Sequence, residues 1–584
     1  MKKKLLPALI VTGLIILVVI IMGITALINK YTPTKKTEDL KEYFNISSDD
    51  EAALIVDNEL SDYKAKIIDK KIYVDYKFVH DSLNSRFYWD ANENVLLYTT
   101  ASDIISAASD SNSYSVTKQT NDFGYPIVKA TSDSALIALD YVKQYSNITF
   151  KSYDDPARIV ITSKWDEIDS ATVSKSTQVR VKGGIKSPIL KEVKKDDNIT
   201  ILDSGDKWDK VATEDGVIGY IKRKALSESK KTKLTNPDYE EETFTHIKKD
   251  KDICLAWNQV TSQSANSKVP QVISSTKGIN VMSPTWFYLN DNNGNLADIA
   301  SKDYVSYCHS QGIEVWGLFS NFENTDVDAA YVLTHTSTRT TLINQIMSAA
   351  FNYELDGVNI DFENITEAAY GDSYIEFIRE LAIKCHNNGI SLSVDVTVPA
   401  SFNKFFNRSD MANFADYIVI MGYDEHYKGS DAGSVSSIPW VTEGVESTLK
   451  EVPADQIILG MPFYTRIWEL TPKEDDDAVT DTEDQSKYTV ASQVYSMDAA
   501  AAQLATNNAT AALDEESGQN YAEWSASNKL YKVWLEDNTS LEKRAQSLEE
   551  KLKVMKENNL AGTAVWKLGF ENSSVWDTVI KYLD

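Results

Sequence analysis

The stretch Leu355-Asp356-Gly357-Val358-Asn359-Ile360-Asp361-Phe362-Glu363 decides how this chain folds and what chemistry it carries. Alternate residues of a β-strand share a face, so the apolar Val358, Ile360 and Phe362 point one way. The opposite face carries two neighbouring carboxyls, Asp361 and Glu363. Crowded carboxyls push their pKa values apart, and one in a partly dry pocket stays protonated near neutral pH, as a general acid requires. The pattern is typical of enzymes that cleave glycosidic bonds.

The same stretch resembles the Asp-x-x-Asp-x-Asp-x-Glu signature of glycoside hydrolase family 18, the chitinase-like enzymes. Three of the four acidic positions match, at Asp356, Asp361 and Glu363, whereas the second is Asn359. The alternative is a strand whose acids pair with buried Arg or Lys for packing alone. Three acids at this spacing favour the catalytic interpretation.

Length and charge restrict what the whole chain can be. A chain of 584 residues exceeds one hydrophobic core and predicts three or more domains. The formal net charge of −27 argues against nucleic acid as a partner, because neutralising phosphates needs a basic surface. Cys254, Cys308 and Cys385 lie in apolar or helical runs and are expected to be core thiols.

The chain begins with a basic cluster followed by an apolar run. Lys2, Lys3 and Lys4 precede the uncharged residues 5–28, which are long enough as a helix to cross about 30 Å of hydrocarbon. The length, and the lack of a clear cleavage site, favour an uncleaved anchor over a removed signal peptide. We therefore expect a single-pass protein of the cell membrane whose remaining domains lie outside the cell.

Two small domains are predicted between this helix and the catalytic region. Residues 42–165 contain short alternating segments typical of hairpins in an α+β domain, and they resemble the amino-terminal domain of copper amine oxidases. Residues 170–226 contain short strands separated by glycines and resemble a bacterial SH3 domain, a small β-barrel. Trp208 in this second domain either faces a ligand or fills the barrel.

The fold class expected for the rest is α/β. Residues 227–251 are charged and polar and are predicted to be a linker, and residues 252–584 alternate strand-like with helical stretches. The eight predicted strands are 253–257, 279–283, 313–319, 357–362, 390–398, 417–421, 457–463 and 562–566. This number predicts a (β/α)8 TIM barrel, and the family resemblance implies the same fold.

One interval is too long for a simple connection between barrel strands. Nearly a hundred residues separate Phe463 from Gly562, and they predict an insertion at about residues 466–530. This segment is either a folded subdomain beside the cleft or a loop with one incidental helix. Its acidic run, residues 474–477, belongs to the same interval.

The family resemblance implies roles for the carboxyls. Glu363 is expected to protonate the glycosidic oxygen and then to act as base toward water. Asp361 is expected to hold the acetamido N–H of the substrate, whose own oxygen attacks C1 in this family. Asn359 is expected to contribute to substrate binding; it can donate a hydrogen bond to Asp361 but cannot share a proton with it. Asp356 is expected to support the strand from deeper in the barrel, in either a structural or an electrostatic role.

Two further strand ends match the family. Tyr423, in the sequence Met421-Gly422-Tyr423-Asp424, would donate to the acetamido oxygen, and Asp424 would either bind sugar hydroxyls or steady Glu363. Trp566 would form the floor under the reacting sugar. Trp286 and Tyr464 also lie at predicted strand ends, and each is either part of a sugar subsite or barrel filling.

The segments 421–435, 438–440 and 460–464 resemble the branch of the family that contains spore-cortex and wall-lytic glucosaminidases. With the anchor and the SH3-like module, this favours peptidoglycan as the substrate, cut at the β-1,4 bond after N-acetylglucosamine. A chitinase, an endoglycosidase for other glycans, a catalytically inactive glycan-binding protein and an envelope scaffold remain alternatives. No cofactor and no metal site are expected, because the six histidines lack ligand spacing.

Overall fold

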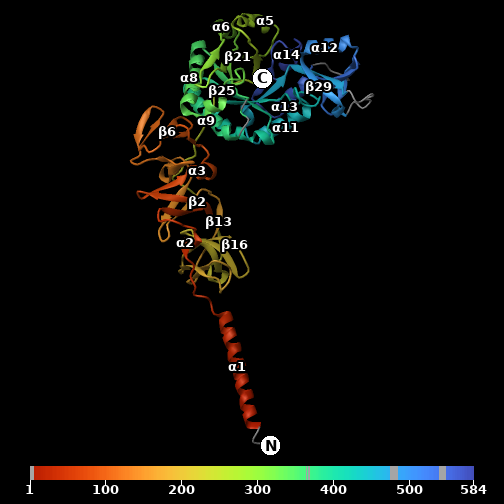
Figure 1. Cartoon of the computed structure of the whole chain (residues 1–584). Coiled ribbons are helices and arrows are strands. Elements are labelled where there is room, and N and C mark those ends of the chain that lie inside the picture. The colour runs from red at the N-terminus through yellow and green to blue at the C-terminus, as the bar shows by residue number, and fades with distance from the viewer. Residues whose placement is uncertain (1–4, 364, 366–367, 474–483, 538–546, 584) are drawn as a thin grey trace. The chain divides into compact units, whose positions relative to one another are not determined.

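The computed structural model describes residues 5–363, 365, 368–473, 484–537 and 547–583. The chain divides into two compact units (Figure 1). The N-terminal unit comprises residues 1–89, 107–114 and 120–241, and the barrel unit comprises residues 90–106, 115–119 and 242–584. The barrel unit therefore includes a segment that lies far upstream of the barrel in sequence.

The first helix of the N-terminal unit is apolar along its whole length. Helix α1 covers Leu5–Tyr31, and its portion Leu9–Tyr31 is long and apolar enough to cross a membrane. A signal sequence near the N-terminus has the same properties, so α1 is a candidate for either.

The N-terminal unit contains two sheets that share one core. The first is mixed, in the order β11-β12-β1-β2-β3-β10-β9, and β1 pairs in parallel with β12. Ala53 and Ile55 of β1 pack with Val179 and Ile221 of the second sheet. The elements of this first part are α2 (Leu40–Tyr43), β1 (Glu51–Val56), β2 (Glu59–Ile68), β3 (Lys71–Asp75), α3 (Tyr76–Ser82), β9 (Val128–Ala130), β10 (Ala135–Ala138), α4 (Leu139–Gln144), β11 (Thr149–Tyr153) and β12 (Arg158–Thr162).

The second sheet has the order β15-β14-β18-β17-β16-β13-β19, and all its pairings are antiparallel. Its strands are β13 (Glu167–Thr172), β14 (Thr177–Arg180), β15 (Ile189–Val193), β16 (Asn198–Asp203), β17 (Trp208–Thr213), β18 (Ile218–Lys222) and β19 (Lys230–Lys233). Strand β19 comes from the predicted linker and pairs with β13, so part of that segment belongs to the sheet. The SH3-like and amine-oxidase-like resemblances remain predictions.

Eight parallel strands of the barrel unit close into a barrel, as the sequence predicted. They are β20 (Ile253–Asn258), β21 (Val281–Leu289), β23 (Glu314–Ser320), β24 (Gly357–Asp361), β25 (Ser391–Thr397), β26 (Tyr417–Met421), β27 (Ile457–Pro462) and β33 (Gly562–Trp566). Strand β20 pairs with both β21 and β33, which completes the closure. The surrounding helices include α5 (Val269–Val272), α6 (Lys302–Ser310), α7 (Ala329–Thr334), α8 (Thr336–Tyr353), α9 (Ala368–His386), α10 (Arg408–Phe414), α11 (Ile438–Thr448), α13 (Ser547–Glu557) and α14 (Val575–Val579).

The amino-terminal end of the barrel is covered by the last residues of the predicted linker. The backbone N–H of Ile247 donates to the carboxylate of Asp416, and the backbone N–H of Lys249 donates to the hydroxyl of Tyr417. Asp416 and Tyr417 lie where β26 begins. This stretch is therefore part of the barrel unit rather than a free connection.

The long interval after β27 contains a folded sheet. Its order is β29-β28-β32-β31-β30, and helix α12 (Met497–Thr506) packs against β28 and β29. The strands are β28 (Tyr464–Pro472), β29 (Tyr488–Ser496), β30 (Ala512–Asp514), β31 (Gln519–Ala526) and β32 (Lys529–Leu535). The interval thus forms a sheet with a helix against it, while the acidic run 474–477 lies outside the described residues.

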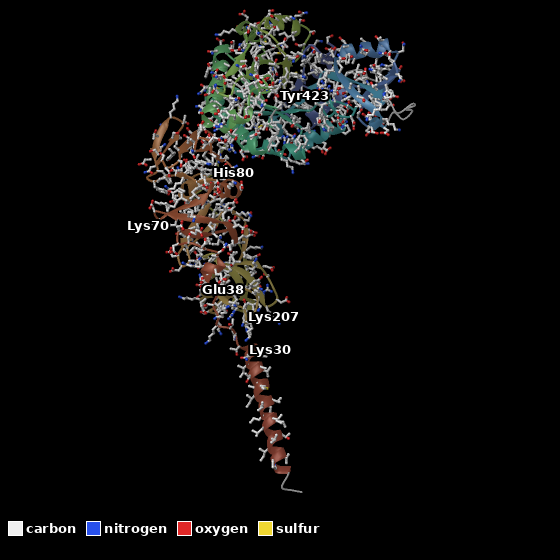
Figure 2. The ribbon with its side chains drawn as sticks, viewed as in Figure 1. Lys30, Glu38, Lys70, His80, Lys207 and Tyr423 are labelled. Atoms are coloured by element: carbon white, nitrogen blue, oxygen red, sulfur yellow. The ribbon has the colours of Figure 1, made fainter. Side chains whose placement is uncertain are left out.

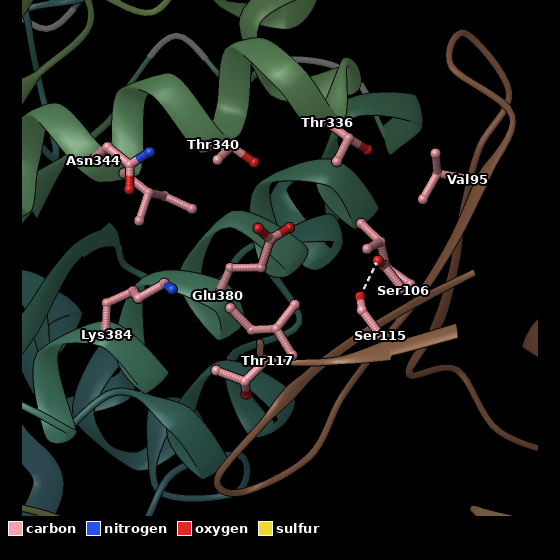
Figure 3. Close-up of a pocket in the computed structure, with 12 residues that line it drawn as sticks. Val95, Ser106, Ser115, Thr117, Thr336, Thr340, Asn344, Glu380 and Lys384 are labelled. Atoms are coloured by element: carbon pink, nitrogen blue, oxygen red, sulfur yellow. Dashed lines mark hydrogen bonds between the residues drawn. The ribbon is translucent and has the colours of Figure 1, made fainter. Parts of the chain in front are cut away.

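The upstream segment of the barrel unit, residues 90–106 and 115–119, is called the arm. It carries β5 (Val95–Thr99) and parts of β6 (Ile104–Ala108) and β7 (Ser113–Val116). Figure 3 shows Ser106 and Ser115 of the arm, joined by a hydrogen bond, facing Thr340 and Asn344 of α8 and Lys384 of α9 across a cavity of about 310 Å³.

The arm also completes the start of α8. The residue before this helix, His335, makes no side-chain capping hydrogen bond. Asp90, which is 1% exposed, accepts hydrogen bonds from the Thr336 N–H (2.7 Å) and hydroxyl (2.6 Å), and Glu93 accepts from the N–H and hydroxyl of Ser337. An acidic side chain at the start of a helix accepts hydrogen bonds from the free N–H groups of the first turn. Its negative charge also interacts favourably with the positive end of the helix dipole.

We predict that Asp90→Ala destabilises the barrel unit. The substitution leaves the partly buried N–H and hydroxyl of Thr336 at the first turn of α8 without an acceptor, a loss of about 2 kcal/mol. Thermal unfolding followed by circular dichroism should show a lower melting temperature than the wild type. Asp326→Asn, which changes an exposed acid of the same unit, serves as the matched control and should leave the melting temperature unchanged. Equal melting temperatures for Asp90→Ala and wild type would contradict the capping role.

Candidate active site

A cavity of about 420 Å³ opens at the carboxyl ends of the barrel strands. Ligand sites of TIM barrels lie at this end, because the loops after the strands converge there. The residues that line it are Trp257, Gln259, Thr285, Leu318, Phe322, Glu323, Asp361, Glu363, Asp395, Thr397, Met421, Tyr423, Asp424 and Trp566. Six of the sequence-predicted site residues are therefore brought together: Asp361, Glu363, Met421, Tyr423, Asp424 and Trp566.

The two carboxyls of the opening stretch both reach this cavity. Asp361 is the last residue of β24 and pairs with Ser320 of β23, so its inward side chain lies at the barrel mouth. Glu363 follows two residues later, and its backbone N–H donates to Oδ1 of Asn321 (3.0 Å). This bond fixes the chain just beyond the strand and orients Glu363 toward the cleft.

Burial and neighbouring charge act on both groups. Asp361 is 8% exposed, and burial together with the charges of Asp395 and Glu363 raises its pKa well above the ordinary range. Glu363 opens to the cleft, yet the loss of surrounding water, with the charges of Asp424 and Glu323, also raises its pKa. A carboxyl with a raised pKa keeps its proton near neutral pH and can donate it.

Tyr423 and Asp424 follow β26 at the same rim (Figure 2 labels Tyr423). Burial and the nearby Asp361 and Asp395 raise the pKa of Tyr423 well above its ordinary value, so its hydroxyl remains a hydrogen-bond donor. Asp424 accepts a hydrogen bond from the Tyr464 hydroxyl (2.6 Å). Tyr464 is only 4% exposed and is not among the residues that line the cavity, so its hydroxyl helps to hold Asp424 in place.

Aromatic rings form a wall of the cavity. Trp257 packs edge-to-face against Trp566, with ring centroids 6.1 Å apart, and against Tyr423 at 6.4 Å. Trp566 ends β33 and is partly exposed, whereas Trp257 is 1% exposed. Trp566 therefore offers an accessible indole face, which suits stacking against the C–H face of a sugar.

Asn359 lies beneath the cavity and is fully buried. Its Oδ1 accepts from Trp257 Nε1 (2.9 Å) and Ser283 Oγ (2.8 Å). Its Nδ2 donates to Ser393 Oγ (3.0 Å) and Asp395 Oδ1 (2.7 Å). The sequence predicted a substrate contact and a possible hydrogen bond to Asp361. In the structure the whole amide joins neighbouring strands, and Asn359 is not among the residues that line the cavity.

Two other predicted residues lie outside the cleft. Asp356 precedes β24 at the opposite end of the barrel and accepts from His309 Nε2 and the Val315 N–H, both at 2.8 Å, which is a supporting position. Trp286 was a candidate subsite residue, but it is fully buried and donates to Asn266 Oδ1 (2.7 Å). Its strand position turns the ring outward into the layer between barrel and helices.

Sequence reasoning missed several cleft residues, chiefly Asp395 on β25 and Glu323 after β23. One signal was available for Asp395: the run Ser393-Val394-Asp395-Val396-Thr397 alternates polar and apolar residues, like the opening stretch. Glu323, Phe322 and Gln259 lie in loops after strands, where no periodicity marks a side chain as facing the cavity.

The described residues contain no cluster of three or more His, Cys, Asp or Glu with the geometry to hold a metal ion. The three cysteines are buried and free, and burial raises the pKa of the Cys254 and Cys308 thiols to about 12. These thiols are core side chains within the barrel unit.

Comparisons with known proteins find one family model and several distant relatives. Residues 316–571 match the family model described as Glycosyl hydrolases family 18. An uncharacterised glycosylase of Bacillus subtilis, YvbX, is 23% identical over 50% of this chain and 81% of its own length. A cortical fragment-lytic enzyme of the same organism is 25% identical over 49% of this chain and 63% of its own length, so the chain spans less than two thirds of that relative.

A solved structure is also similar. The C-terminal domain of a putative chitinase from Desulfitobacterium hafniense has a TM-score of 0.49 at 18% identity, covering 57% of this chain and 99% of that domain.

We predict that Asp361→Asn stabilises the protein at neutral pH. Because the pKa of Asp361 is raised in the folded chain, the unfolded chain releases this proton first, and the free energy of unfolding falls as pH rises above about 4. Asparagine has the same shape and does not ionise. Melting temperatures measured across pH should show a gain at neutral pH that shrinks toward pH of about 4.

Asp326→Asn again provides the control, since this acid is exposed and its substitution should leave the melting temperature unchanged. A variant Asp361→Asn that melts at the wild-type temperature at every pH would show that the buried carboxyl carries no such penalty.

Proposed function

We propose that this chain, whose residues 316–571 match the model of Glycosyl hydrolases family 18, hydrolyses β-1,4 bonds after N-acetylglucosamine in peptidoglycan. The observation that carries this proposal is the convergence of Glu363, Asp361, Tyr423 and Trp566 on one cavity. These four supply a proton donor, a second carboxyl that can accept a hydrogen bond, a hydroxyl donor and an aromatic platform. A cavity of about 420 Å³ lies within the range of small-ligand sites.

Glu363 is the proposed general acid and base. Burial raises its pKa, which favours the protonated form that can donate to the leaving oxygen of the glycosidic bond. Once that proton has gone, the same carboxylate accepts a proton from the water that completes hydrolysis. The exposure of Glu363 to the cleft gives both the leaving sugar and the water access to it.

The nucleophile is proposed to be the acetamido oxygen of the substrate itself, which attacks C1 and forms an oxazolinium ion. Asp361 would accept the acetamido N–H and balance the developing positive charge, and Tyr423 would donate to the acetamido oxygen. Trp566 would hold the sugar from below in a distorted shape. The reaction then retains configuration at C1, because two displacements occur at that carbon.

The choice of peptidoglycan rests on relatives that bear the name cortical fragment-lytic enzyme in Bacillus subtilis and Bacillus anthracis. A di-N-acetylchitobiase of Dictyostelium discoideum, 24% identical over 39% of this chain, favours chitin oligomers as the second candidate substrate. Both polymers contain the acetamido sugar that the proposed mechanism needs. The experiment below separates them.

We predict that the detergent-solubilised full-length chain releases fragments with N-acetylglucosamine reducing ends from purified peptidoglycan. Glu363→Gln should lose nearly all activity, a fall of about a thousandfold in kcat, because the amide cannot donate the proton. Mass spectrometry of the reduced products identifies the terminal sugar. Chitin oligomers assayed in parallel measure the preference between the two polymers.

Tyr427→Phe is the control and should retain wild-type activity, because Tyr427 is exposed and is not among the residues that line the cavity. Proton NMR should detect the β anomer first. Muramic acid reducing ends, an initial α anomer, or full activity in Glu363→Gln would refute the assignment.

We further propose that α1 anchors the enzyme in the cell membrane with both units outside the cell. The basic residues Lys2 to Lys4 before the apolar helix favour retention of the N-terminus in the cytoplasm. The SH3-like sheet β13–β19 follows α1 and precedes the barrel strands in the chain. We propose that it contacts wall polymers.

If α1 is an anchor, the full chain should sediment with membranes and should not be extracted by high salt. Salt screens charges but does not weaken the burial of an apolar helix in lipid. Fractionation of producing cells, followed by N-terminal sequencing, provides the measurement. A chain lacking residues 1–31 is the matched control and should be soluble. Recovery of the wild type in the medium with its first residues removed would identify α1 as a cleaved signal.

A further inference from the structure

Asp395 is a buried acid at the cavity that the mechanism above does not use. It lies on β25, next to β24, and the parallel register pairs Ile360 with Val394. The next position on each strand is therefore Asp361 and Asp395. Both side chains point into the barrel mouth, because both residues line the cavity.

The surroundings leave these two carboxyls without a balancing charge. Asp395 is 3% exposed, Asp361 is 8% exposed, and none of the described residues that line the cavity is Lys or Arg. Burial is the largest cause that raises the pKa of each one, and the charge of Asp395 is the next cause for Asp361. Two ionised carboxylates in a dry site repel strongly, and such a pair retains one proton.

Hydrogen bonding distinguishes the two acids. Asp395 accepts from Nδ2 of Asn359 at 2.7 Å, which favours its ionised form. Asp361 has a fully buried Oδ1 with no hydrogen-bond partner. A buried carboxyl oxygen without a partner is costly unless it carries or receives a proton. Before substrate binds, the proton is therefore best placed on Asp361, while Asp395 is ionised.

Other ionisable groups face the pair from each side. They are Glu363 at the end of β24, Glu323 from the segment after β23, Tyr423 from β26 and Tyr374 from α9. All are acids, so no group nearby supplies positive charge to replace the retained proton.

We propose that Asp395 is the proton partner of Asp361: the two carboxyls share one proton, which passes from Asp361 to Asp395 when positive charge develops on the substrate. This inference rests on the proposed function, and it makes Asp395 a positioning residue that acts through Asp361. One O–H bond breaks on Asp361 and one forms on Asp395, so the pair keeps a single negative charge throughout. Asp361 is thereby ionised only when the oxazolinium ion needs it.

The arrangement also accounts for Asn359. An amide at that position cannot share a proton, and its N–H is committed to Asp395 and Ser393. The partner acid therefore stands on the adjacent strand instead of two positions earlier on the same strand. Asn359 fixes Asp395 beside Asp361 and holds its acceptor oxygen in place.

The decisive variant is Asp395→Asn. Its side-chain oxygen still accepts from Asn359, so a purely structural role of Asp395 predicts no change. Infrared difference spectra of the full chain in detergent at neutral pH report protonated carboxyls directly. We expect the wild-type spectrum to contain a protonated-carboxyl band that is lost in both Asp395→Asn and Asp361→Asn. Other buried acids cancel in the difference.

The swapped variant Asn359→Asp/Asp395→Asn keeps the 359–395 hydrogen bond and restores an acid beside Asp361, so the band should return. It also keeps the test decisive if Asp395→Asn folds poorly. A band that persists in Asp395→Asn, or that fails to return in the swap, would overturn the proposal.

Turnover of an aryl glycoside of N-acetylglucosamine supplies the second readout. Asp395→Asn should lower kcat about tenfold with little change in KM, and the swapped variant should recover most of it. An unchanged kcat in Asp395→Asn would also overturn the proposal. If the wild type shows no turnover at all, the proposed function fails, while the infrared result still decides whether the proton is shared.

Discussion

The buried amide of Asn359 is the interaction on which the barrel mouth depends. It joins β24 to Trp257 of β20, to Ser283 of β21 and to two side chains of β25, and all four of its hydrogen-bonding positions are used. A fully satisfied polar group in a dry interior permits little movement, because each lost bond leaves an unpaired group. The strands that carry Trp257 and Asp395 are therefore fixed relative to the strand that carries Asp361.

Above this layer the site concentrates negative charge. Asp361, Glu363, Asp395, Glu323 and Asp424 all line one cavity. Water would screen them if the site were open, but burial removes that screening for Asp361 and Asp395, so protons must remain. The proposed chemistry uses these retained protons at two residues. Glu363 donates its proton to the leaving oxygen, and Asp361 releases its proton to Asp395 when positive charge develops on the substrate. The buried carboxyls that the proposed reaction needs therefore lower the free energy of unfolding at neutral pH.

The boundaries of the barrel unit differ from those that the order of the sequence suggests. The arm contributes Asp90 and Glu93 to the start of α8, more than two hundred residues away in sequence. The residues before β20 seal the other end through Ile247 and Lys249. A catalytic domain cut at residue 252 would lose both. The barrel unit therefore includes the arm and the segment before β20 as well as the eight strands.

The sequence by itself determined the barrel and the principal carboxyls. Eight apolar runs with helical spacers specify the closed parallel sheet, and strict alternation along 357–363 assigns Asp361 and Glu363 to the inward face, because both signals are local. Only the tertiary structure decided which acids meet. It placed Asp395 beside Asp361, brought Glu323 into the cavity from a loop, and put Trp286 and Asn359 below the surface. Register between strands and the path of loops arise from long-range packing, which no single stretch of sequence encodes.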